Sequence, residues 1–155
     1  TSGLVGRHLH PQVVQILQAI GQAWQRVTNK PSGMPNHITV TGASMRWGGL
    51  NPPHITHRFG GTADIRPIGT RSGPVSVGDA HYHREATGII VDLMKQTGAT
   101  EIRFADNLPG VTAIDRSHRD HIHVSWLSQP QEPWLTKQVS FQLQQKKAKK
   151  LGRKK

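Results

Sequence analysis

The sequence I-D-R-S-H-R-D-H-I-H-V-S-W, from Ile114 to Trp126, alternates apolar and polar residues over its second half. This alternation predicts a β-strand from Ile122 to Trp126. Side chains two positions apart in a strand point to the same face, so His121 and His123 would reach into one cavity. Ile122 and Val124 would point to the opposite face of the strand and pack into the core. One strand would thus join the hydrophobic core to a histidine site.

The same H-x-H spacing recurs at His81 and His83, in a segment whose apolar spacing predicts a helix from Asp79 to about Thr97. On a helix, two positions correspond to a rotation of about 200°. These two imidazoles would therefore diverge, and we do not expect them to form a site.

The second segment of interest is T-H-R-F-G-G-T-A-D-I-R-P, from Thr56 to Pro67. The glycine pair and the closing proline argue against a helix here. We expect a loop that tightens at Gly60–Gly61 and enters a short strand from Thr62 to Ile65, with Asp64 pointing to the site. His57 would lie in the loop.

The histidines and the aspartate are of the type that binds zinc. Catalytic zinc usually takes three protein ligands, from imidazole nitrogen and carboxylate oxygen, and leaves a fourth position for water. The chain has no cysteine, so a metal site would have to use His and Asp. One His, one Asp and a second His would meet that requirement.

The two segments resemble a known family. H-R-F-G-G-T-A-D-I is similar to the H-x6-D signature of zinc peptidases that cut the bacterial cell wall, which share their fold with D-Ala-D-Ala carboxypeptidases, phage endolysins and Hedgehog signalling domains. H-R-D-H-I-H-V most resembles the penicillin-insensitive murein endopeptidase branch, where a His three positions before the H-x-H replaces a glutamate of the carboxypeptidase branch. The resemblance covers roughly Val40 to Trp126, and the two motifs carry nearly all of it.

The resemblance implies roles for five residues. His57, Asp64 and His123 would hold one zinc ion, while His118 and His121 would act on the substrate. His121 would take a proton from water or stabilise the oxyanion, and His118 would help to deliver a proton to the leaving amine.

Three further residues are weaker candidates. Arg46 falls where the family has an arginine beside the cleft, and a guanidinium can hold a carboxylate or a carbonyl. A plain surface arginine is the alternative. Asp120 also matches the endopeptidase motif. It could equally be a hydrogen-bond partner of a metal ligand or a turn residue. Asp115 or Asp120 could orient one of the imidazoles.

The implied function is zinc-dependent hydrolysis of an amide bond in the peptide of peptidoglycan. Endopeptidase action on cross-linked stem peptides is favoured, and N-acetylmuramoyl-L-alanine amidase or carboxypeptidase activity stays open. The loops 46–56 and 66–78 would form the cleft walls that choose among them. A G-x-S-x-G elbow of serine hydrolases is absent, and a zinc deaminase would need cysteines.

The expected fold class is α+β, a small antiparallel sheet flanked by helices, as in the Hedgehog and DD-peptidase group. A strand at Ile38 and Val40 follows the first helix, and a hairpin turns at residues 106–110. The expected helices are 11–28 and 79–97, and the expected strands are 38–40, 62–65, 101–105, 111–115 and 122–126.

The sequence has 155 residues, enough for one domain, which we place at 1–145 with a core at about 10–128. Residues 146–155 hold seven Lys or Arg and no acid, and so supply +7 of the net charge of +11. We expect this tail to be disordered and to adhere to anionic polymer or membrane surfaces, without recognising a specific nucleic acid. A non-catalytic polyanion-binding domain is therefore the competing function.

The sequence begins with Thr1 rather than Met, so we expect a processed chain or a domain of a larger protein. The implied substrate places its action in the periplasm or the extracellular cell wall. No export signal or long apolar run accompanies that expectation in the sequence.

Overall fold

The structure, a computed structural model, describes residues 8–43, 60–71 and 73–127. Within these ranges, two helices and five strands follow one another in the predicted order α, β, β, α, β, β, β. They are α1 (Pro11–Arg26), β1 (Val40–Gly42), β2 (Thr62–Ile65), α2 (Arg84–Gln96), β3 (Glu101–Phe104), β4 (Ala113–Ile114) and β5 (Ile122–Ser125).

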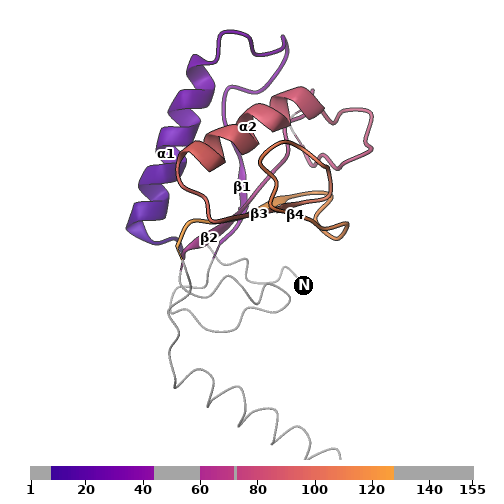
Figure 1. The fold of residues 1–155 in the computed structure, drawn as a ribbon. Coiled ribbons are helices and arrows are strands. Elements are labelled where there is room, and N and C mark those ends of the chain that lie inside the picture. The colour runs from indigo at the N-terminus through magenta and orange to yellow at the C-terminus, as the bar shows by residue number, and fades with distance from the viewer. Residues whose placement is uncertain (1–7, 44–59, 72, 128–155) are drawn as a thin grey trace, which may run out of the picture.

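The strands form one sheet in the order β1-β2-β5-β3-β4, and both helices pack on the same side of it (Figure 1). This arrangement confirms the α+β class. The sheet is mixed rather than wholly antiparallel, because β3 and β4 run parallel while the other pairs are antiparallel.

The core lies between the helices and the sheet. Helix α1 buries Val13, Leu17, Ile20 and Trp24, which recur at spacings of three and four residues. The indole of Trp24 donates a hydrogen bond of 2.8 Å to the carbonyl of Pro35. From the sheet side, Ile122 and Val124 of β5 are fully buried, as predicted for the strand. The other large buried side chains of the core include Ile20, Ile65, Ile90, Met94, Ile102 and Phe104.

The predicted hairpin between β3 and β4 is wrong. The connection of residues 105–112 carries Leu108 into the core, where it is 3% exposed, and returns the chain to the start of β3. There Thr112 donates its backbone N–H to the carbonyl of Ile102, and its hydroxyl accepts from the Ile102 N–H. The chain then continues in the same direction as β3, so the turn residues form a crossover loop.

The second helix begins later than predicted, at Arg84 instead of Asp79. Asp79 caps a separate turn, in which Tyr82 donates to its carbonyl at 3.0 Å. The backbone N–H of His83 donates to the carbonyl of Ile68, and Gly69 pairs with Tyr82 in an isolated bridge. These bonds draw the segment before Arg84 into extended pairing with the 68–70 loop, so it cannot join the helix.

The prediction that His81 and His83 sit on a helix is therefore also wrong, although both are engaged in local contacts. His83 precedes α2 as its N-cap and accepts from the N–H of Ala86 at 3.2 Å. His81 lies 3.1 Å from the hydroxyl of Thr70.

In the described ranges, no helix has the length and apolar character needed to cross a bilayer. The tail at 146–155 lies outside these ranges, as do both ends of the predicted domain 1–145.

The two neighbouring isoleucines of α2 test how the helix supports the sheet. Ile90 is fully buried and Ile89 only partly, so Ile90→Ala should lower the free energy of unfolding by about 2–5 kcal/mol, because it leaves a cavity in the core. The matched variant Ile89→Ala should cost about 1 kcal/mol. Urea unfolding measures both. Equal losses would contradict the described packing of α2.

Candidate metal centre and its imidazoles

Strands β2 and β5 bring together two residues that are 59 positions apart. Their antiparallel register pairs Asp64 directly with His123. Nδ1 of His123 lies 3.0 Å from Oδ1 of Asp64, and each residue is only 3% exposed. Burying a carboxylate or an imidazole without a hydrogen-bond partner costs folding free energy. The contact between Asp64 and His123 therefore satisfies both groups within the sheet.

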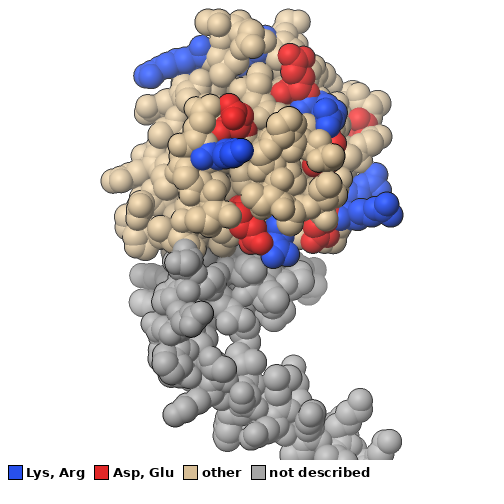
Figure 2. All heavy atoms as spheres, in the orientation of Figure 1, with Lys and Arg blue, Asp and Glu red and all other residues tan. Residues whose placement is uncertain are grey.

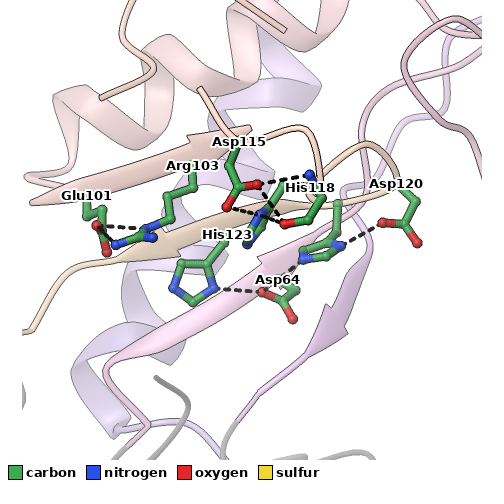
Figure 3. Close-up of polar contacts among 9 residues, drawn as sticks. Asp64, Glu101, Arg103, Asp115, His118, Asp120 and His123 are labelled. Atoms are coloured by element: carbon green, nitrogen blue, oxygen red, sulfur yellow. Dashed lines mark hydrogen bonds and ion pairs between the residues drawn. The ribbon is translucent and has the colours of Figure 1, made fainter. Parts of the chain in front are cut away.

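Two more imidazoles lie beside this pair (Figure 3). Nε2 of His121 is 4.0 Å from Oδ1 of Asp64. The ring of His118 has its centroid 4.8 Å from that of His121 and 5.8 Å from that of His123. The side chains of His118 and His121 are 19% and 21% exposed, so these two rings reach solvent while Asp64 and His123 do not.

Each of these partly exposed imidazoles has its own aspartate. Nδ1 of His118 lies 3.0 Å from Oδ2 of Asp115, and Nδ1 of His121 lies 2.8 Å from Oδ1 of Asp120. In both of these contacts the imidazole nitrogen is Nδ1, while Nε2 of His121 also lies 4.0 Å from Asp64. Nε2 is then the atom that can exchange a proton with a reacting group.

The loop that carries His118 is fixed by backbone hydrogen bonds. The N–H of His118 donates to the carbonyl of Asp115, and the carbonyl of His118 accepts from Ala105. The next residue, Arg119, exchanges two bonds with Val77: its carbonyl accepts from the Val77 N–H, and its guanidinium donates to the Val77 carbonyl at 2.7 Å. The loop 66–78, predicted to line the cleft, is thus attached directly beside the imidazoles.

Burial lowers the pKa of His118 below its ordinary value of 6.5, and the neighbouring His121 lowers it further. Asp115 acts in the opposite direction without reversing the shift. The pKa of Asp115 is itself lowered, first by hydrogen bonds from the side chain and the backbone of Ser117. At neutral pH the pair is therefore a carboxylate beside a neutral imidazole.

The donor set suits zinc. Asp64 and His123 offer a carboxylate oxygen and an imidazole nitrogen at one buried point, which matches the preference of zinc for oxygen and nitrogen ligands. Among the residues that the structure describes, no group of three or more His, Asp or Glu side chains is placed to hold a metal ion. Two of the three predicted ligands are thus adjacent, and the third, His57, lies outside the described residues, as does Arg46.

Three features of the site escaped the sequence-based prediction. Gly42 of β1 pairs with Asp64, and a Cβ at position 42 would stand 2.5 Å from Oδ2 of Asp64. A glycine within a strand is the signal for such a close approach. Ser117 holds Asp115, and the D-x-S pattern of an Asx turn could have indicated it. Arg103 pairs with His123 in the register of β3 and β5.

The pKa of His118 gives a prediction that needs no substrate. An NMR titration of its ring C–H signals should give a midpoint below 6.5, because burial disfavours the imidazolium. The folded state then binds fewer protons than the unfolded state between that midpoint and pH 6.5. This ring should therefore make the free energy of unfolding rise with pH across that window. Its contribution is fully present above pH 6.5 and is lost as the pH falls through the midpoint. A midpoint above 6.5 would contradict the described environment.

Comparison with known proteins found one distant similarity. The chain is 28% identical over 114 residues to the protein named "Putative zinc metalloprotease TRE2" of Saccharomyces cerevisiae. The match covers 63% of this chain but only 14% of the yeast protein. No family model and no solved structure matches the chain.

Proposed function

We propose that this protein is a zinc-dependent hydrolase of bacterial cell-wall peptide that cuts an amide bond in peptidoglycan, with endopeptidase action favoured. The strongest support for this proposal is the buried contact between Asp64 and His123. The partly exposed imidazoles of His118 and His121 lie beside it. The motif resemblance supplies the substrate class, and the name of the distant yeast relative is in keeping with a zinc peptidase.

In this proposal His57, Asp64 and His123 hold the metal. When bound, zinc supplies an activated water and polarises the carbonyl of the scissile amide. The burial of Asp64 and His123 would fix these two ligands before the ion arrives, because neither side chain has room to turn.

Proton transfer in this proposal belongs to His118 and His121. Both rings have Nδ1 beside a carboxylate, so Nε2 is the nitrogen that would accept a proton from the attacking water or stabilise charge on the carbonyl oxygen. The lowered pKa of His118 suits it to accept a proton at neutral pH before it returns that proton to the leaving amine. The carbon–nitrogen bond breaks as the new carbon–oxygen bond forms.

The substrate in this proposal is the stem peptide of peptidoglycan, and the site of action is the periplasm or the extracellular wall. Arg46 would bind a carboxylate or carbonyl of that peptide. The basic segment 146–155 would hold the enzyme near anionic polymer or membrane surfaces. Cleavage of the muramoyl–alanine amide, or removal of a terminal residue, would use the same groups.

Removal of either proposed metal ligand, Asp64 or His123, should strongly weaken zinc binding. Mutation of a residue that only hydrogen-bonds to a metal ligand typically weakens metal affinity by roughly 10–100-fold. Asp64→Asn and His123→Ala should each weaken zinc affinity by more than that. The matched control is His81→Ala, which removes an exposed imidazole whose ring contacts Thr70. Isothermal titration with zinc alone measures all three. Wild-type affinity in both ligand variants would contradict the assignment of the metal.

Mass spectrometry of fragments released from purified peptidoglycan tests the reaction. The intact, zinc-loaded protein should release defined fragments, and the fragments should disappear after chelation and in His123→Ala. Their masses identify the bond that is cut.

A truncation at residue 145 separates the enzyme from a polyanion-binding domain. An enzyme should keep its turnover on soluble wall fragments without the tail, whereas a polyanion binder should lose its affinity for anionic polymer. No release by the zinc-loaded protein, on wall from several bacterial types, would sink the proposed hydrolase.

A further inference from the structure

The carboxylate of Asp115 is held from two sides in the loop that follows β4. Its Oδ1 accepts from the backbone N–H of Ser117 at 2.9 Å and from the Ser117 hydroxyl at 2.7 Å. Its Oδ2 lies 3.0 Å from Nδ1 of His118. Figure 3 shows Asp115 beside His118, between Arg103 and Asp120. Asp115 is therefore fixed before it meets the imidazole.

This arrangement selects one tautomer of His118. An ionised carboxylate can only accept hydrogen bonds, so the Nδ1 that faces Asp115 must carry the hydrogen. The hydroxyl of Ser117 also lies 3.1 Å from this Nδ1. Because the hydroxyl hydrogen is already donated to Asp115, the oxygen can only accept from Nδ1. Both contacts thus require Nδ1–H and leave the lone pair on Nε2.

The comparable pair of Asp120 and His121 is less constrained. Asp120 is bonded to His121 at 2.8 Å, but its side chain is 67% exposed, against 34% for Asp115. A carboxylate that faces water holds an imidazole less firmly, because water competes for its oxygens. Asp120 therefore serves as a matched control within the same loop.

We propose that Asp115, held by Ser117, is a positioning residue that fixes His118 in the Nδ1–H tautomer and so makes Nε2 of His118 the atom that takes and returns the proton. The tautomer follows from the contacts alone, whereas the proton transfer rests on the proposed hydrolase function. In that reaction Nε2 receives one proton from water as the carbon–oxygen bond forms. It gives that proton to the nitrogen as the carbon–nitrogen bond breaks, so His118 ends neutral.

Nitrogen-15 NMR of the imidazoles tests the tautomer in the full chain, both with zinc and without it. At a pH of about 8, above the ordinary histidine value, His118 should show a protonated Nδ1 and an unprotonated Nε2. Its signals are assigned by their loss in His118→Gln. An Nε2–H tautomer in the unmodified protein would overturn the proposal without the need for any variant.

Two variants test the cause. Asp115→Asn offers an amide N–H as well as an oxygen, so a substantial fraction of His118 should move to the Nε2–H tautomer. Ser117→Ala keeps the carboxylate but frees it, and should produce a smaller shift in the same direction. Asp120→Asn should leave the tautomer of His118 unchanged. An unchanged His118 tautomer in a folded Asp115→Asn protein would also overturn the proposal.

Kinetics on soluble wall peptides then test the consequence. Asp115→Asn should lower kcat by about 10–100-fold with little change in KM. This loss is typical when a residue that orients a catalytic side chain through a hydrogen bond is removed. Asp120→Asn should lower kcat less. If the wild-type protein shows the Nδ1–H tautomer but hydrolyses no wall peptide, the proposed function fails and the positioning of His118 stands. Equal kcat in Asp115→Asn and the wild type would remove the catalytic part of the proposal.

Discussion

The antiparallel pairing of β2 with β5 is the constraint on which the rest of the structure depends. It places Asp64 opposite His123, and in the same register it places Ala63 opposite Val124. Because successive side chains alternate between faces, the same four pairs of residues build the floor of the core and the centre of the site. A register shift of one residue would exchange the two sets and destroy both.

The site is supported as firmly as the core, since Asp64 and His123 are nearly as buried as the apolar residues beside them. A charged carboxylate at such a position needs a partner, and the sheet supplies the imidazole at 3.0 Å. The close approach of Gly42 on the neighbouring strand leaves space for the carboxylate, where any side chain would collide with it. These requirements explain why the polar pair sits in the middle of strands and not on a loop.

The two partly exposed imidazoles are held differently, by a loop and not by a strand interior. His118 depends on Asp115 and on backbone bonds to Ala105, while the adjoining Arg119 ties the loop to Val77. This division suits the proposed chemistry. The residues that would bind the metal are fixed by the sheet, and those that would move protons lie at the solvent-facing edge, where substrate can reach them.

Local periodicity predicted much of the fold. The spacing of apolar residues indicated α1 and the burial of Ile122 and Val124, because both depend on a short segment alone. The glycine pair at 60–61 and Pro67 indicated the strand Thr62–Ile65. The sequence also predicted that Asp64 would point to the site, and the family resemblance implied that Asp64 and His123 would share a metal ion. The predicted placement of a third ligand at His57 lies outside the described residues.

Only the tertiary structure decided the features that depend on contacts between distant segments. The parallel direction of β4 accompanies the burial of Leu108 in the connection before it, and the late start of α2 accompanies the hydrogen bond between His83 and Ile68. The local sequence of β4 or of α2 does not show which distant residues that segment will contact. The tautomer of His118 depends on neighbours within three positions along the chain, but the sequence offered Asp115 and Asp120 as alternatives. The folded geometry of the loop assigned Asp115 to His118 and Asp120 to His121. Hydrogen-bond partners are chosen by distance in space, which apolar spacing along the chain does not encode.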